Sequence, residues 1–381
     1  MKKDFRLIAV LLTLVFAVLA CSSSFEVVGT QPPSPDQSDT PTTASDQILP
    51  HTLYYFGTDN AGLTQIFRME RDGKTATQLT HETVAVGRYD VSRADGSVAY
   101  VANNQLILMN ADGSNRRLLL DGGPLDPNSP MENRLYYPVF SPDGQTIAYA
   151  HHGLNLYQVT TGDSQLVLPD ELYRPEKYSP DGAKLLMTVS VPNSDATHDV
   201  IYDPATNSIV NFNYADGAFF CCGREKWTQD SLSFYVAYPA MGMLSPGLWK
   251  VDAASGNVTT LLPSEAGDGN FNLADEPYLA SDGQLYYFFA NASSADGYSD
   301  RAPLQIVRAA PDGVTGRIVL RPETFETLSE ALWAPDASFV IVAKTPTDSA
   351  NAGSIVELYY TDAAKSMVPL LPFGQRLQWG P

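Results

Sequence analysis

The chain has 381 residues, of which 44% are hydrophobic, so it can bury a sizeable core. Its 43 Asp and Glu residues outnumber its 24 Lys and Arg residues, which gives a formal net charge of −19. This balance argues against a nucleic-acid-binding protein, which needs a basic surface, and suits a soluble extracytoplasmic domain.

Residues 1–20 are predicted to be a secretory signal peptide. Lys2, Lys3 and Arg6 give a positively charged start, and residues 7–19 are apolar apart from one threonine. This apolar stretch is too short to span a membrane comfortably, and no later segment is apolar enough to do so.

The residues that end at Cys21 resemble the lipobox of bacterial lipoproteins. In that family the cysteine is lipidated and becomes the mature N-terminus, so the resemblance implies a lipid anchor on Cys21. Residues 21–50 are rich in Ser, Thr, Pro, Asp and Gln. A segment of this composition buries too little apolar area to fold, so we expect a tether. The alternative is an ordinary signal peptide followed by a chance cysteine.

A sevenfold repeat fills residues 51–381. Its clearest copies place Ser-Pro-Asp-Gly after an aromatic residue, at Phe140 and at Tyr178. Each repeat is predicted to contain an inner strand that ends in an Asp turn, two further strands and a short fourth strand. The second strands are expected at 52–56, 98–101, 146–149, 184–188, 232–237, 284–289 and 339–343. The third strands are expected at 65–70, 105–110, 155–159, 199–203, 248–252, 305–309 and 356–361.

The two ends of the repeat region complement each other. The first repeat begins directly at a second strand, whereas the chain ends in residues 377–381, which match the inner strand at 331–335. We expect this C-terminal inner strand to join the N-terminal blade, which closes a ring and removes exposed strand edges. The predicted fold is therefore all-β: a seven-bladed β-propeller of four-stranded blades.

The Ser-Pro-Asp-Gly turn, the apolar strand after it and the later Asp-Gly turn resemble the TolB-type, WD-like β-propeller repeat. The resemblance covers residues 51–381, and two repeats carry the full motif. It implies a propeller that binds a protein or a cell-envelope component. No segment before residue 51 resembles the amino-terminal domain of TolB, so TolB's own role is not implied.

The two faces of the predicted ring differ. The turn aspartates recur at one position in each repeat, which favours a structural role in which Asp caps backbone N–H groups; they are Asp143, Asp181, Asp230, Asp282 and Asp336. The opposite face carries the long insertions 121–134, 190–198, 239–246, 263–275, 291–303 and 345–354. Long loops on a rigid scaffold commonly bind ligands, although insertions can also simply be tolerated there.

The inner strands are expected to line a central channel that opens at the long-loop face. The residue three places before each inner-strand aromatic position marks the channel mouth. These residues are Arg88, Tyr137, Pro175, Arg224, Glu276, Glu330 and Arg376, with Arg174, Glu176 and Glu225 nearby. Such a rim can hold an anionic or peptide ligand through arginine, or it can be a set of solvated ion pairs.

The remaining chemistry-bearing residues give weak signals. Cys221 and Cys222 are adjacent, and a vicinal disulfide is favoured slightly over free thiols or intermolecular bridges. Neither lies at a zinc-ligand spacing, so no metal site is predicted. His151 and His152 are adjacent, and neighbours on a strand point to opposite faces, so they do not easily bind one ion; the histidines are expected to be surface or loop residues. No nucleophile elbow and no phosphate-binding glycine loop occurs, and no cofactor is expected.

These observations favour a non-enzymatic binding or interaction module. It is expected to be a monomer, held to a membrane only by its lipid, with a protein or cell-envelope partner and no nucleic acid. The anchored domain would be periplasmic or at the cell surface, depending on the envelope. One alternative is a carbohydrate-active or quinoprotein-like enzyme that uses Glu276, Glu330 and Arg224 in the channel. Another is a structural envelope protein.

Overall fold

A computed structural model describes residues 47–128, 133–169, 172–190, 197–214, 224–239, 246–293, 302–346 and 354–381. Residues 45–381 form one compact unit. The predicted signal peptide, Cys21, most of the tether, Cys221 and Cys222 lie outside the described residues. Within the described ranges no helix is long and apolar enough to cross a membrane.

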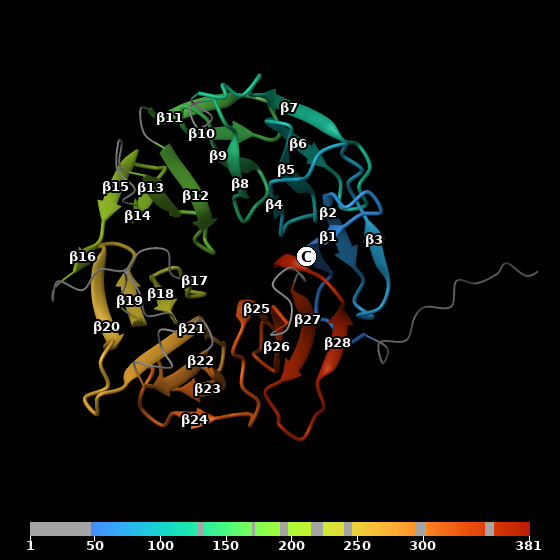
Figure 1. The fold of residues 1–381 in the computed structure, drawn as a ribbon. Coiled ribbons are helices and arrows are strands. Elements are labelled where there is room, and N and C mark those ends of the chain that lie inside the picture. The colour runs from blue at the N-terminus through green and yellow to red at the C-terminus, as the bar shows by residue number, and fades with distance from the viewer. Residues whose placement is uncertain are drawn as a thin grey trace, which may run out of the picture. The chain divides into compact units, whose positions relative to one another are not determined.

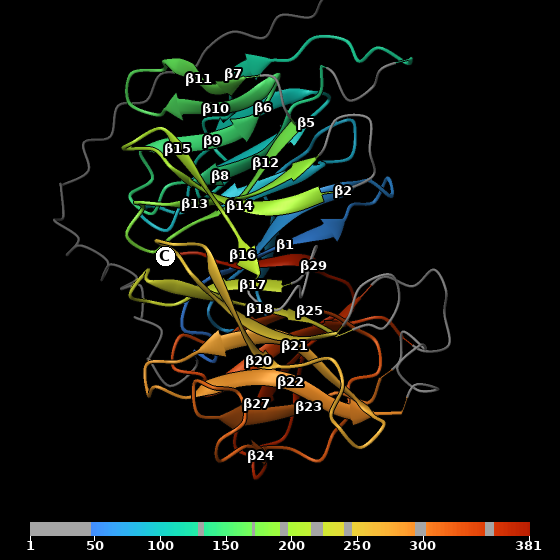
Figure 2. The same ribbon diagram turned by 90° about the vertical axis from the view of Figure 1, so that its left-hand side faces the viewer.

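Seven antiparallel sheets form a ring, as Figure 1 shows face-on and Figure 2 shows edge-on. The predicted all-β, seven-bladed propeller is therefore confirmed. From the inner strand outward, blade 1 contains β29 (Gln375–Trp379), β1 (Leu53–Thr58), β2 (Thr64–Met69) and β3 (Ala76–Gln78), and blade 2 contains β4 (Arg88–Val91), β5 (Val98–Ala102), β6 (Gln105–Met109) and β7 (Arg117–Asp121). Blade 3 contains β8 (Tyr136–Phe140), β9 (Thr146–Ala150), β10 (Gly153–Gln158) and β11 (Ser164–Pro169). Blade 4 contains β12 (Leu172–Tyr178), β13 (Leu185–Ser190), β14 (Thr197–Asp203) and β15 (Ser208–Asn211).

The remaining blades follow the same order with one addition. Blade 5 contains β17 (Arg224–Trp227), β18 (Ser233–Tyr238), β19 (Gly247–Asp252) and β20 (Asn257–Leu262). Blade 6 contains β21 (Phe271–Leu279), β22 (Leu285–Ala292), β23 (Gln305–Ala309) and β24 (Ile318–Val319). Blade 7 contains β25 (Leu328–Trp333), β26 (Phe339–Lys344), β27 (Ile355–Tyr360) and β28 (Val368–Leu371).

Blade 5 departs from the predicted four strands. A fifth strand, β16 (Asn213–Tyr214), pairs in parallel with β20 at the outer edge. The Asn213 backbone N–H donates to the Gly256 carbonyl at 2.8 Å, and its side-chain amide donates to the Ser255 carbonyl at 2.9 Å. A two-residue strand held partly by a side chain leaves no periodicity in the sequence, so pattern reasoning did not find it.

The ring closes where predicted. The C-terminal strand β29 pairs antiparallel with β1, with Leu53 opposite Trp379, and the Gly380 N–H donates to the Thr52 carbonyl at 2.9 Å. The propeller also begins slightly before residue 51. Leu49, assigned to the tether above, is only 2% exposed and packs between blades 7 and 1.

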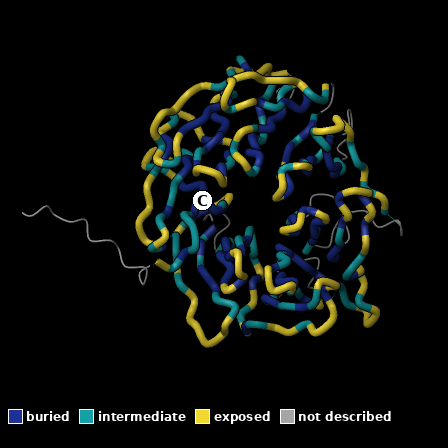
Figure 3. Tube along the Cα trace, turned by 180° about the vertical axis from the view of Figure 1, so that it is seen from behind, coloured by how far each residue is buried: buried dark blue, intermediate teal, exposed yellow. Residues whose placement is uncertain are grey.

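The core lies between the blades. Each of the seven interfaces between neighbouring blades holds a hydrophobic cluster among the described residues. At one of them, Tyr54 and Ile66 of blade 1 pack against Tyr100 of blade 2. Figure 3 shows that buried segments run through the middle of the blades, and that exposed segments lie at the outer rim and also around the central opening. Inter-blade burial therefore stabilises the ring, which makes closure energetically important.

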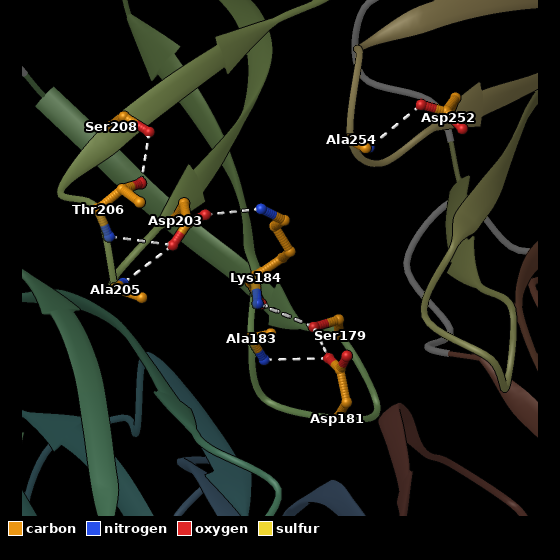
Figure 4. A network of polar contacts seen from close by, with 10 residues as sticks. All are labelled: Ser179, Asp181, Ala183, Lys184, Asp203, Ala205, Thr206, Ser208, Asp252 and Ala254. Carbon is orange, nitrogen blue, oxygen red and sulfur yellow. Dashed lines mark hydrogen bonds and ion pairs between the residues drawn. The ribbon is translucent and has the colours of Figure 1, made fainter.

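The Asp turns are structural, as predicted. The Asp181 carboxylate accepts the Ala183 N–H at 3.0 Å and the Ser179 hydroxyl at 2.6 Å, and that hydroxyl in turn accepts the Lys184 N–H at 2.9 Å (Figure 4). The hydrogen bond from Ser179 is the main reason why the pKa of Asp181 lies below its usual value. Asp143, Asp230, Asp282 and Asp336 accept the N–H two residues ahead in the same way.

Candidate functional site in the central channel

The inner strands are irregular where they approach the channel mouth. A β-bulge or similar register shift interrupts the pairing of β8, β12, β21, β25 and β29. Tyr137, Glu276 and Arg376, three predicted mouth residues, have φ values of 52°, 46° and 55°. A left-handed backbone strains a residue that has a side chain, and such strain is concentrated at functional sites. Three of the predicted mouth residues therefore have a strained backbone conformation.

Arg88 and Tyr137 meet across blades 2 and 3. The Arg88 guanidinium carbon lies 4.4 Å from the centroid of the Tyr137 ring, and one guanidinium nitrogen donates to the tyrosine hydroxyl at 3.1 Å. This cation–π contact presents a partly exposed positive charge beside an aromatic ring. Arg174 lies half-buried on β12. The pKa of Glu176 is raised by desolvation, and the Arg174 charge partly offsets this rise.

An ionic cluster joins blades 5 and 6. The buried Glu276 carboxylate, 1% exposed, lies 3.0 Å from the Lys226 ammonium and 3.5 Å from the Arg224 guanidinium. Burial alone would raise the pKa of Glu276, but these two cations outweigh it and hold the pKa below its usual value. At the neighbouring Asp275, burial and the Glu276 charge outweigh the Arg224 guanidinium 3.9 Å away and raise the pKa to about 7.

Three channel carboxylates bond to the backbone of the next blade. Glu330 accepts the N–H groups of Arg376 at 2.7 Å and Leu377 at 2.8 Å. Asp90 accepts the Phe140 N–H at 2.7 Å, and Glu276 accepts the Ala331 N–H at 3.2 Å. We call Asp90, Glu276 and Glu330 the inter-blade clamps. Because each clamp satisfies an amide on the open edge of an inner strand, its first role is to hold neighbouring blades together.

A second acidic group lies between blades 4 and 5. Burial, reinforced by the nearby Asp199 and Glu176 carboxylates, raises the pKa of Glu225 well above its usual value. Asp199 lies on the third strand β14 and is buried; one of its oxygens accepts the Thr188 hydroxyl at 2.8 Å. Its other oxygen has no hydrogen-bond partner among the residues that the structure describes.

A cavity of about 480 Å³ occupies the channel on the side of the Asp turns. Residues of all seven inner strands line it, including Glu330 and Arg376 from the predicted mouth. Arg88, Tyr137, Arg174, Arg224 and Glu276 are not part of its lining. The charged lining residues are Asp90, Arg93, Glu176, Lys177, Lys226, Glu330 and Arg376. The channel thus holds a charged cavity that the prediction did not describe, whereas the assignment of the other residues to a binding mouth stays a prediction.

Several channel groups were missed by the sequence analysis. In their inner strands, Asp90, Lys177 and Lys226 come one place before the position that is usually aromatic. Because side chains alternate along a strand, they face the channel like the predicted mouth residue two places earlier in the same strand. That signal was present but was not used. Asp275 was assigned to a loop, whereas β21 begins at Phe271. Asp199 comes from another strand layer, and only the tertiary structure brings it to this group.

The prediction that the histidines are surface or loop residues is confirmed for His151 and His152, whereas their expected placement on opposite faces of a strand was wrong. His151 and His152 lie in the turn between β9 and β10, where His152 has a φ of 52°, and not within a strand. Their rings are 4.3 Å apart, and both Nε2 atoms lie 3.1 Å from the Asn133 side-chain oxygen. Among the described residues, no group of three or more His, Cys, Asp or Glu side chains is placed to hold a metal ion.

Burial of channel acids predicts an unusual dependence of stability on pH. The pKa of the partly buried Glu330 is raised to about 7 by desolvation in the channel and by the Glu276 charge. A folded state that binds a proton more tightly than the unfolded state loses stability as pH rises. The melting temperature should therefore fall between pH 5 and pH 7.5, and it should fall less steeply in Glu330→Gln. Replacing the exposed Glu326 by Gln is the matched control. A melting temperature that rises across this range, or equal slopes in all three proteins, would contradict the assignment.

Comparisons with known proteins identify the fold but no family. No family profile matches the sequence, and no curated protein matches it. An oligogalacturonate lyase in complex with manganese is similar in structure, with a TM-score of 0.54, 11% identity and coverage of 84% of each chain. A prolyl endopeptidase has a TM-score of 0.50 and 13% identity over 88% of this chain and 51% of its own. TolB from Acinetobacter baumannii has a TM-score of 0.46 and 16% identity over 87% of this chain and 67% of its own. At these identities the likeness concerns the propeller fold, which enzymes share.

Proposed function

We propose that this protein is a lipid-anchored, extracytoplasmic binding module that holds a protein or cell-envelope ligand at the mouth of the propeller channel. The mouth consists of the bulged parts of the inner strands together with the residues Arg88, Tyr137, Arg174 and Arg224. The anchor is Cys21, and residues 21–46 form the tether. The activity proposed is binding without turnover.

One observation carries this proposal. At the mouth, cationic and aromatic side chains remain accessible, and one of them, Tyr137, stands on left-handed backbone. Arg224 is 44% exposed although it reaches Glu276 at 3.5 Å, and Arg88 is half-buried above the Tyr137 ring. Arginine and tyrosine are enriched where proteins bind partners, because both combine a large contact area with directed hydrogen bonds. A rim of this kind on a rigid ring suits a docking partner.

The channel acids favour binding over catalysis. Glu276 and Glu330, the acids of the enzyme alternative, accept backbone N–H groups from the next blade. Glu276 also faces two cations that stabilise its ionised form. A general acid needs a transferable proton near the operating pH, and the low pKa of Glu276 opposes that role. The pKa of Glu330 is raised to about 7, but both of its carboxylate oxygens already accept backbone N–H groups.

The anchor gives a direct prediction. Replacing Cys21 by serine removes the sulfur to which a lipid would be attached, so the protein should move from the membrane fraction to the soluble extracytoplasmic fraction. Fractionation of cells that express the full chain, followed by immunoblotting, measures this. A serine substitution at Cys222 is the matched control and should leave the protein in the membrane fraction. Retention of the Cys21→Ser chain on membranes would refute the lipid anchor.

Site-specific photo-crosslinking tests the binding face. Tyr137 is replaced by benzoylphenylalanine, which keeps an aromatic ring at the mouth. Leu232, 68% exposed in the Asp turn of blade 5, receives the same group as control. Irradiation of intact cells should produce a discrete adduct from position 137 and none from position 232. The same adducts at both positions, or none at position 137, would contradict binding at the mouth.

A further inference from the structure

The lining of the channel cavity contains more cationic than acidic side chains. Four cations and three acids line it, whereas the rest of the chain has 20 cations and 40 acids. The lining cations are Arg93, Lys177, Lys226 and Arg376, and the lining acids are Asp90, Glu176 and Glu330. In a protein with a net charge of −19, this is a local excess of positive charge around an open space.

Two of the three lining acids differ from three of the four cations in how they are bonded. Asp90 and Glu330 are inter-blade clamps, and their oxygens accept backbone N–H groups at 2.7 to 2.8 Å. Among the cations, Lys226 is paired with Glu276 at 3.0 Å. Within the described ranges, the side chains of Arg93, Lys177 and Arg376 have no carboxylate oxygen within 4.0 Å and no hydrogen-bond acceptor.

We propose that this cavity is an anion-binding site for an organic carboxylate, held by Arg93, Lys177 and Arg376. The site lies toward the Asp turns and uses none of Arg88, Tyr137, Arg174 and Arg224, so the inference does not rest on the proposed partner binding; Arg376 alone is shared with the predicted mouth. A guanidinium presents a donor fork that matches a carboxylate, and an ammonium adds a point charge.

The walls and the volume of the cavity favour an organic anion over an inorganic one. Phe140, Trp227, Tyr278, Leu332 and Trp379 contribute apolar and aromatic surface to the lining. A volume of about 480 Å³ suits a small molecule or the end of a peptide. A free polycarboxylate and the C-terminal carboxylate of a peptide share this chemistry, and the experiment distinguishes them.

Isothermal titration of the full-length protein in detergent micelles at low ionic strength tests the site. The titration is done at pH 6, below the pKa of Lys177, which burial and the Arg93 and Lys226 charges lower to about 7. Probes are citrate, a tetrapeptide with a free C-terminus, the same peptide amidated, and sodium phosphate. We expect citrate or the free peptide to bind and the amidated peptide not to bind. Tighter binding of citrate identifies a free polycarboxylate as the ligand class, and tighter binding of the free peptide identifies a peptide end.

Variants connect the binding to the named residues. Arg93→Gln and Lys177→Gln should each weaken binding about tenfold or more, because each removes a charged contact. Arg117→Gln makes the same change in net charge on the exposed outer strand β7 and should leave the affinity unchanged. The proposal is overturned if neither carboxylate probe binds at millimolar concentration, if phosphate binds more tightly than both, or if Arg93→Gln and Lys177→Gln bind like Arg117→Gln.

Discussion

Replacing Trp379 by alanine is expected to reduce the free energy of unfolding by about 3–5 kcal/mol and to loosen the closure of the ring. Trp379 is 8% exposed on β29, the C-terminal strand that completes the N-terminal blade. Its ring packs 6.3 Å from that of Phe339, and its indole N–H donates to the Trp333 carbonyl at 2.8 Å. The substitution therefore leaves a large cavity and an unsatisfied carbonyl at the junction of blades 7 and 1. Equilibrium urea unfolding measures the loss.

The control for this prediction lies on the same strand. Gln375 is exposed on β29, so Gln375→Ala should change the free energy of unfolding by less than about 0.5 kcal/mol. Amide hydrogen exchange separates ring opening from general weakening: β1 should lose protection in Trp379→Ala more than β13 does. A stability loss no larger than that of Gln375→Ala, or equal loss of protection in β1 and β13, would show that the closure does not depend on this residue.

Replacing Glu276 by alanine is expected to cost about 2–3 kcal/mol, because the substitution removes a buried acceptor and leaves two cations without their partner. The expected loss is below that of a fully buried ion pair since Lys226 and Arg224 are 28% and 44% exposed and can be hydrated. Glu276→Gln keeps an acceptor for the Ala331 N–H and should lose about half as much. Thermal and urea unfolding of both variants measure the difference.

Glu326→Ala is the matched control for Glu276→Ala, because Glu326 is exposed outside the channel and its loss should stay within about 0.5 kcal/mol. Two outcomes would contradict a clamping role for Glu276. The first is a Glu276→Ala chain that is as stable as Glu326→Ala, and the second is a glutamine variant that is less stable than the alanine variant.

The repeat pattern explains why the fold could be predicted so closely. Second strands such as β5, predicted at 98–101 and found at Val98–Ala102, are continuous apolar runs that follow a turn motif. The split blade followed from matching the two chain ends. In contrast, β16 depends on an amide side chain of Asn213, and no sequence period encodes it.

The site was predicted only in part. Counting along the inner strands predicted a set of mouth residues, among which the structure brings Arg88 to Tyr137 and Arg224 to Glu276. The role of these residues in binding stays a prediction. Neither the left-handed backbone at Tyr137 nor the bonding of Glu330 to the next blade follows from residue order. Both depend on how one blade meets its neighbour, which local patterns do not contain.

In the channel, acidic residues hold neighbouring blades together, and cationic residues are proposed to bind the ligand. The clamp acids hold backbone amides across blade boundaries, whereas the side chains of Arg93, Lys177 and Arg376 line the cavity with no carboxylate oxygen of the described residues within 4.0 Å. On this account, the clamp acids of the lining stabilise the contacts between blades, and the cations of the lining bind the ligand. Mutations of acids and of cations should then have different consequences.

Ligand-induced thermal stabilisation of channel variants tests this division most directly. The unaltered chain, Glu276→Gln and Lys177→Gln are melted with and without citrate, or with the free-carboxylate peptide if that probe binds more tightly, since a ligand of the folded state raises its stability. We predict that Glu276→Gln melts at a lower temperature but keeps the ligand-induced increase, and that Lys177→Gln melts no lower than the unaltered chain but loses the increase. A Lys177→Gln chain that keeps the full increase, or a Glu276→Gln chain that melts unchanged and loses it, would contradict the account.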